Sequence, residues 1–135
     1  MTTQDHHLTP GNNCSLTISS RDMFSSHRLI IVSGQTYHFA VSPTDLWFDM
    51  GCPTNANGFN NVFVRWFGKT LRVKEAKCFA LCGILNKNKA TAFVIGTELR
   101  KTFSEGGVLS FFANDVEDYY GNNFGKIMLE VLRLK

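Results

Sequence analysis

The C-terminal part of the sequence places a polar loop between two strand-like segments. It reads Val108-Leu109-Ser110-Phe111-Phe112-Ala113, then Asn114-Asp115-Val116-Glu117-Asp118-Tyr119-Tyr120-Gly121-Asn122-Asn123-Phe124-Gly125, then Lys126-Ile127-Met128-Leu129-Glu130-Val131-Leu132-Arg133-Leu134. In the last segment Ile127, Leu129 and Val131 occupy every second position, which is the period of a strand with one buried face. The order therefore predicts a strand, an oxygen-rich loop and a second strand.

Short strand-like segments recur through the rest of the chain. They lie at residues 15–19, 29–32, 36–41, 91–96 and 101–103, and residues 62–67 and 71–73 flank Gly68-Lys69 as the arms of a hairpin. About eight strands with turns every 8–12 residues predict an all-β fold, a two-sheet antiparallel β-sandwich or jelly roll. Residues 73–85 stay ambiguous between helix and strand, because part of this segment is good helix-forming sequence.

Two segments are predicted to be irregular. Residues 1–13 are polar and end in Pro10-Gly11-Asn12-Asn13, so we expect a flexible leader followed by one domain over residues 14–135. Residues 42–58 are rich in Gly, Pro and Asn in their second half, which predicts a long surface loop. At its root, Trp47 and Phe48 either anchor the loop in the core or stack on a ligand.

Composition and charge exclude several classes of protein. The 135 residues are 44% hydrophobic and carry a net charge of +3, with scattered basic residues, so a nucleic-acid partner is not indicated. No segment approaches the roughly 20 apolar residues of a membrane helix, and the N-terminal residues lack the pattern of a signal peptide. We therefore expect a soluble protein without membrane insertion, either cytoplasmic or exported by a non-classical route.

Catalytic motifs are missing from the sequence. It has no Gly-x-Ser-x-Gly elbow, no His-Glu-x-x-His and no phosphate-binding glycine loop. The spacing of Cys78 and Cys82 is not that of a zinc site, and with Cys14 and Cys52 there are only four cysteines, too few for a disulfide scaffold. We therefore expect a protein that is not an enzyme.

The loop at 114–125 has the composition of a calcium site. Five oxygen-bearing side chains fall within nine positions: Asp115, Glu117, Asp118, Asn122 and Asn123. Ca²⁺ binds roughly 6–8 oxygen atoms from carboxylates, amides and main-chain carbonyls, although the same residues also suit an ordinary polar turn. An ion held by such a loop would keep open positions that two neighbouring sugar hydroxyls could occupy.

The segment from Phe79 to Val131 resembles the PA-I type galactophilic lectins, small calcium-dependent bacterial lectins with a β-sandwich fold of the galactose-binding-domain-like kind. The run that carries the resemblance most closely is Asn114-Asp115-Val116-x-x-x-Tyr120-Gly121-Asn122-Asn123-x-Gly125. Upstream, Trp47-Phe48-Asp49-Met50-Gly51 followed by Pro53-Thr54 matches more loosely. The resemblance favours strand over helix at residues 78–85.

The resemblance also implies a ligand set. The side chains of Asp115, Asn122 and Asn123 and the carbonyls of Tyr119 and Met50 would bind Ca²⁺. Sugar would contact Asp115, Val116, Tyr119, Asn122 and Asn123. Glu117 and Asp118 stand where the family has a Pro-Gly pair, Tyr119 replaces a small hydroxyl residue, and Phe124 replaces a small polar one.

These observations lead to a function prediction with one alternative. The prediction is a calcium-dependent carbohydrate-binding protein for a galactoside or another glycan, assembled as a homo-oligomer because multivalency strengthens weak sugar binding. The alternative is a non-catalytic β-sandwich module for protein interaction or structure that has lost sugar binding and uses the aromatic residues of 59–67.

Overall fold

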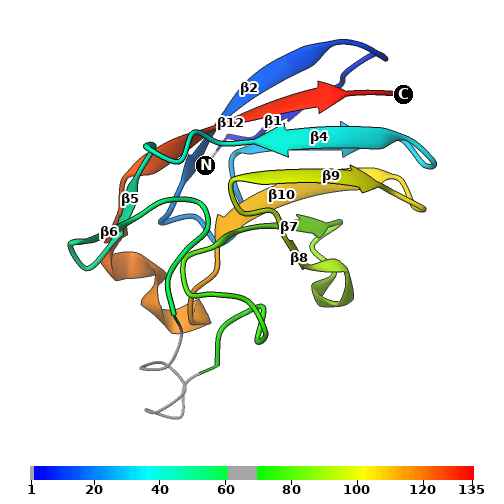
Figure 1. Ribbon diagram of the computed structural model, residues 1–135. Helices are drawn as coiled ribbons and strands as arrows, with labels where there is room; N and C mark the ends of the chain where they lie inside the picture. Colours follow the sequence, from blue (N-terminus) through cyan, green and yellow to red (C-terminus); the bar gives the residue numbers. More distant parts are fainter. Residues whose placement is uncertain (1, 61–69) are drawn as a thin grey trace.

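Two main β-sheets form the body of the protein in a computed structural model that describes residues 2–60 and 70–135 (Figure 1). The five-stranded sheet has the order β1 (Gln4–His6), β3 (His27–Ile31), β10 (Gly107–Ala113), β7 (Leu81–Leu85), β8 (Phe93–Val94). The four-stranded sheet has the order β2 (Asn13–Ser19), β12 (Lys126–Arg133), β4 (Thr36–Ala40), β9 (Glu98–Thr102). The predicted all-β sandwich is confirmed.

The alternation of apolar and polar residues in the C-terminal strand gives β12 one buried and one exposed face. Ile127, Leu129 and Val131 of β12 are buried, whereas Met128 and Glu130 are exposed. The strand pairs with β2 on one side and β4 on the other, so it lies in the interior of its sheet. One buried face on an interior strand holds the register, because a slip of one residue would expose all three aliphatic side chains.

Aromatic rings fill the space between the sheets. The ring of Phe39 in β4 lies 6.1 Å from that of Phe111 in β10, edge to face, and Phe103 lies 5.8 Å from Tyr37. Such edge-to-face pairs are favoured by the quadrupole of the rings. The four rings belong to one buried cluster with the aliphatic side chains of both sheets, which is the main core.

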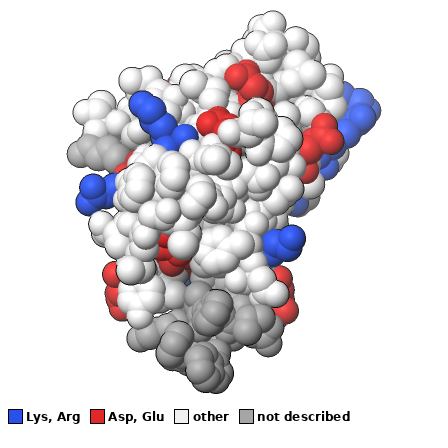
Figure 2. Space-filling view, turned by 60° about the vertical axis from the view of Figure 1, so that its left-hand side comes forward, with Lys and Arg blue, Asp and Glu red and all other residues white. Residues whose placement is uncertain are grey.

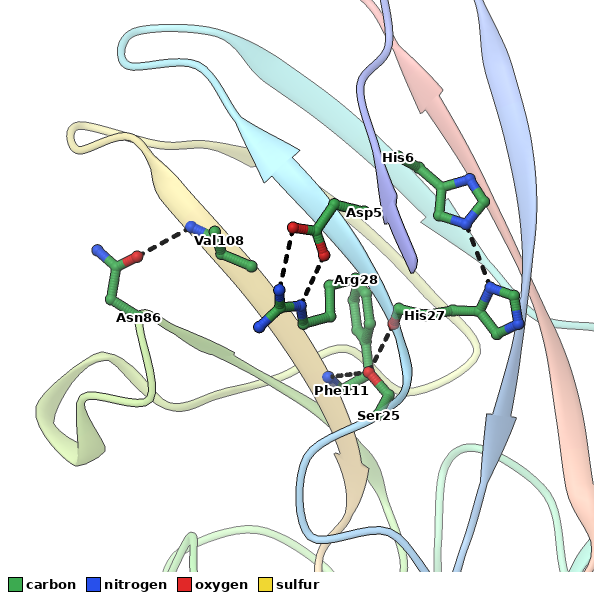
Figure 3. Close-up of polar contacts among 8 residues, drawn as sticks. All are labelled: Asp5, His6, Ser25, His27, Arg28, Asn86, Val108 and Phe111. Atoms are coloured by element: carbon green, nitrogen blue, oxygen red, sulfur yellow. Dashed lines mark hydrogen bonds and ion pairs between the residues drawn. The ribbon is translucent and has the colours of Figure 1, made fainter. Parts of the chain in front are cut away.

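The N-terminal segment differs from the predicted flexible leader. Residues 4–6 form β1, which runs parallel to β3, the one parallel pair among the paired strands described. Figure 3 shows the Asp5 carboxylate accepting two hydrogen bonds from Arg28, at 2.7 and 3.0 Å, and His6 within 3.2 Å of His27. Leu8 is buried in the main core. Residues 4–6 are thus a paired edge strand, because a polar sequence can also form an exposed strand whose side chains have partners.

The predicted surface loop at 42–58 also contains regular structure. β5 (Trp47–Asp49) and β6 (Cys52–Thr54) form a hairpin, and β11 (Asn123–Phe124) pairs with β5 to complete a three-stranded sheet. The turn residues Met50 and Gly51 both have positive φ, 50° and 89°, as a two-residue type I′ turn requires. β6 is an edge strand, so Pro53 removes no hydrogen bond from the interior of the sheet.

The ambiguous segment divides into two parts. Residues 81–85 form β7, so strand is confirmed over helix there, whereas residues 71–80 form turns and one isolated bridge, Phe59 with Cys78. Most of the hairpin predicted around Gly68-Lys69, and most of the aromatic segment 59–67, lies outside the described residues. A 3₁₀ turn, η1 (Lys89–Thr91), connects β7 to β8.

The described part of the chain has no membrane-type helix, and the charge on the side shown in Figure 2 is mixed. Within residues 2–60 and 70–135, no helix combines the length and the apolar character needed to cross a membrane. Figure 2 shows the side of the molecule that bears β5 and β6. On that side most of the surface is uncharged, and acidic and basic side chains are interspersed.

Candidate functional site

The polar loop begins where β10 ends, and Asn114 fixes it in place. The buried Asn114 side chain accepts a hydrogen bond from the Val73 amide at 2.9 Å and donates to the carbonyls of Val73 and Lys77, each at 3.0 Å. Its own backbone pairs with Phe79 and Ala80. Because all these partners are main-chain groups, one asparagine holds the 73–80 segment against the start of the loop. Asn114 therefore positions the loop and has no polar atom left over for a ligand.

The loop then folds back so that Asp115 meets Asn123. Between them runs a 3₁₀ helix, η2 (Glu117–Asn122), which lies beside the β5–β6 hairpin (Figure 1). One oxygen of the Asp115 carboxylate accepts from the Val116 amide at 2.7 Å, and the other accepts from Nδ2 of Asn123 at 3.0 Å. Both side chains are almost fully buried, with exposed fractions of 3% and 2%. Burial raises the pKa of Asp115, and its two hydrogen bonds lower it.

The amide of Asn123 leaves one oxygen without a partner. Its Nδ2 donates to the Ser20 carbonyl and to Asp115, each at 3.0 Å, and these two acceptors fix the orientation of the amide. Oδ1 is then buried with no hydrogen-bond donor, the one such side-chain atom found in the described parts of the chain. A buried acceptor without a donor costs about 1–3 kcal/mol, so this oxygen is available to an external hydrogen-bond donor or cation.

A second carboxylate, Asp49, lies at the same place. In the β5–β11 ladder Asp49 is directly opposite Asn123, and opposite residues on antiparallel strands project from the same face of the sheet. Burial, and then the charge of Asp115, raise the pKa of Asp49 to about 6. Neither Asp49 nor Asp115 takes part in any salt bridge among the residues that the structure describes. The group Asp49, Asp115 and Asn123 is called the carboxylate cluster below.

Asp49 is not among the ligands predicted from the sequence. The residue is followed by Met50-Gly51, the two-residue turn, and its strand pairs with a segment 74 positions later in the chain. A pairing so distant in sequence leaves no local signal. The one available indication was the match of Trp47-Phe48-Asp49-Met50-Gly51 to the upstream part of the resemblance, which places Asp49 next to a predicted ligand.

The other predicted site residues differ in how exposed they are and in which groups they contact. The Met50 amide donates to the Asn122 carbonyl at 3.3 Å, so the hairpin turn and the end of η2 are in direct contact. The Asn122 and Tyr119 side chains are exposed, and Val116 is half-buried. Glu117 is different, because its carboxylate lies 3.5 Å from the Lys89 ammonium group. The structure thus brings Met50, Asp115, Asn122 and Asn123 together at one end of the sandwich.

Comparison with known proteins bears on the fold. No family model and no curated protein matches the sequence. Among solved structures, the chain is similar to one described as "EclA N-terminal domain; PllA-like lectin", with 18% sequence identity, a TM-score of 0.64, and coverage of 88% of this chain and 94% of that one. The chain has a lectin-like fold. Because the identity is low, the likeness concerns architecture, and the role of each site residue stays a prediction.

The carboxylate cluster offers the kind of ligand atoms that the predicted calcium ion requires. Two carboxylates, the orphaned Asn123 oxygen and nearby main-chain carbonyls are hard oxygen donors, the kind that Ca²⁺ prefers. Two adjacent carboxylates without a basic partner leave negative charge in a partly buried place, which a cation would neutralise. The residues present therefore fit a calcium ion.

Proposed function

We propose that the protein is a calcium-dependent carbohydrate-binding protein without catalytic activity. The observation that carries the proposal is the buried, unpartnered Oδ1 of Asn123 beside the carboxylates of Asp115 and Asp49. Its support is twofold: an oxygen-donor set suited to Ca²⁺, and a lectin-like fold. When bound, the ion would supply open coordination positions for vicinal sugar hydroxyls.

The residues of this chain would divide the work between metal and sugar. Asp115, Asn122 and Asn123 would hold the ion with their side chains, and Tyr119 and Met50 with their carbonyls. Asp49 would add a second negative charge, which strengthens calcium binding because carboxylate count is one of its main determinants. Val116 and the exposed Tyr119 would contact the sugar from the side.

The sugar class follows from the resemblance to the PA-I type lectins, so a galactoside is the first glycan to test. Asp118 is exposed in η2 and brings negative charge close to the site, whereas the charge of Glu117 is offset by Lys89. This charge should disfavour acidic sugars at the metal and favour neutral ones. We also propose a homo-oligomer, to be checked by the molar mass in solution, because single-site sugar affinity gains from multivalency.

Calorimetric titration tests the proposal directly. Methyl β-galactoside and then a neutral glycan panel are titrated into the protein with millimolar CaCl₂ and again with EDTA. We expect heat of binding in calcium alone. A calcium-dependent rise of the melting temperature without any glycan binding would keep the metal and reject the carbohydrate. An unchanged melting curve in calcium would favour a protein-interaction or structural module instead, because any ion that binds the folded state must stabilise it.

A further inference from the structure

A second apolar surface lies on the outer face of the five-stranded sheet. Side chains alternate along β7 and β10, so Cys82, Ile84 and Phe112 point away from the main core. They form a separate buried cluster, against which Phe24, Val73 and Ala92 pack. A sheet face that is apolar on its outer side must be covered by the chain or by a ligand.

The described residues 2–60 and 70–135 cover this face incompletely and leave a cavity of about 470 Å³. Phe24, Ile84, Ala92 and Phe112 provide apolar lining, and Arg72, Lys74, Lys87 and Lys89 also line it. The volume lies within the range of about 300–1,000 Å³ that small-molecule sites occupy. Apolar walls with a few convergent polar groups are the usual composition of such sites.

Arg72 is held rigidly at this cavity. Its guanidinium carbon lies 3.6 Å from the centroid of the Phe112 ring and 5.0 Å from that of Phe24. Its Nη1 donates to the Met23 carbonyl at 2.7 Å and to the Tyr120 hydroxyl at 2.9 Å. A guanidinium group that is stacked and hydrogen-bonded loses little further freedom when it binds an anion, which favours recognition of one.

The charges around the cavity are unbalanced. Glu117 is the one acidic residue among the described lining residues, and its carboxylate is paired with Lys89. No ion pair of Arg72, Lys74 or Lys87 occurs in the part of the chain that the structure describes. The Lys87 ammonium group lies instead 4.9 Å from the Phe24 ring centroid. Three cations without a carboxylate partner next to aromatic rings favour a ligand that is anionic at one end and apolar at the other.

We infer that this cavity is a binding site for a small organic anion with a planar apolar body. The body would lie against Phe24, Ile84 and Phe112, and the anionic group would face Arg72, Lys74 and Lys87. The site contains no residue of the carboxylate cluster and does not need calcium, although Val116, which is proposed to contact the sugar, also lines the cavity. Its chemistry suits an aromatic carboxylate or sulfonate, because such ligands combine ring stacking with a compact negative charge.

Three probes separate the charge from the apolar body: 2-naphthalenesulfonate, the neutral 2-naphthalenemethanol, and sodium sulfate. Each is titrated calorimetrically into the full chain, with EDTA present so that calcium plays no part. We expect saturable binding of the sulfonate, at least tenfold weaker binding of the alcohol, and no measurable binding of sulfate. Equal affinity for the sulfonate and the alcohol would overturn the inference, and so would the absence of sulfonate binding.

Charge-reversal variants locate the binding. Lys74 and Lys87 are exposed, so the double variant Lys74→Glu/Lys87→Glu keeps the fold, which its melting temperature verifies. We expect it to bind the sulfonate at least tenfold more weakly than the unmodified protein. The matched control is the double variant Lys126→Glu/Lys135→Glu, which makes the same change in net charge at two exposed lysines outside the cavity lining. If the control variant loses as much affinity as Lys74→Glu/Lys87→Glu, the sulfonate responds to net charge only and the inference fails.

Discussion

The carboxylate cluster and the cavity around Arg72 lie on neighbouring parts of the chain and have opposite charge. The Arg72 amide donates to the Asp115 carbonyl at 3.1 Å, so the backbones that carry the two regions are directly hydrogen-bonded. Their side chains nevertheless do not neutralise each other. Arg72 stacks on Phe112, and Asp115 turns to Asn123. Each region therefore keeps a net charge of its own, which agrees with the two proposed ligands, a cation at the carboxylate cluster and an anion at the cavity.

The largest expected effect comes from removing the residue that joins the two regions. Asn114→Ala deletes three side-chain hydrogen bonds. The Val73 amide loses its partner, whereas the carbonyls of Val73 and Lys77 keep only the backbone bonds from Ala76 and Ala80. We expect a loss of about 3 kcal/mol in the free energy of unfolding, measured by chemical denaturation. Binding of both calcium and the naphthalenesulfonate should weaken together.

Asn88→Ala is the matched control for this substitution. Asn88 is exposed, and its side chain caps only the 3₁₀ turn η1, so it should cost no more than about 1 kcal/mol. If Asn114→Ala were as mild as Asn88→Ala, or if it weakened one ligand alone, Asn114 would not be the shared support of the two regions.

Asp115→Asn should abolish the response to calcium. At a calcium concentration one hundred times its dissociation constant, the unmodified protein gains about 2.7 kcal/mol of stability, and the variant should gain none. Asp118→Asn is the control, because Asp118 is an exposed carboxylate of the same loop. Thermal melts with and without calcium measure both. A variant that keeps the full calcium shift would remove Asp115 from the metal site.

Asp49→Asn separates the cost of a half-buried carboxylate charge from metal binding. The pKa of Asp49 is raised from 3.8 to about 6 in the folded state, so folding favours its protonated form. Stability contributed by that proton is complete below about pH 4 and is lost as the pH rises through 6. The metal-free variant should therefore be more stable at pH 7, by about 1 kcal/mol after allowance for the half-exposed position.

Calcium should reverse the sign of this substitution, because the ion needs the second carboxylate that the variant lacks. We expect the calcium affinity of Asp49→Asn to fall about tenfold, an effect of about 1.4 kcal/mol. Denaturation between pH 4 and 8, with EDTA and with calcium, measures both changes. A metal-free variant that is less stable than the unmodified protein at pH 7 would contradict the proposed cost of ionising the half-buried Asp49 beside Asp115.

The sequence predicts the sandwich well where a strand has one solvent-exposed face and one buried face, as β12 does. It predicts a strand less well where the strand depends on pairing with a segment far away in the sequence. Pro53 is compatible with a strand only because β6 is an edge, and β1 is ordered only because β3 accepts it. For the same reason the sequence did not indicate Asp49 as a ligand, because its place in the proposed metal site depends on its lying opposite Asn123 in the β5–β11 ladder. Local composition was enough to identify Asp115, Asn122 and Asn123 as oxygen donors.

Glu117→Gln has the smallest expected effect and tests the separation of the two regions most finely. Glu117 is an exposed carboxylate of the cavity lining, where it partly cancels Lys89. Its removal should strengthen naphthalenesulfonate binding about twofold to threefold, which corresponds to roughly 0.5 kcal/mol for an exposed charge. Glu105→Gln, an exposed glutamate outside this cavity, should leave the affinity unchanged. Calcium affinity should be the same in both variants, because neither glutamate belongs to the carboxylate cluster. A change in calcium affinity in Glu117→Gln would mean that the 3₁₀ helix couples the two sites, and the anion and the cation would then not bind independently.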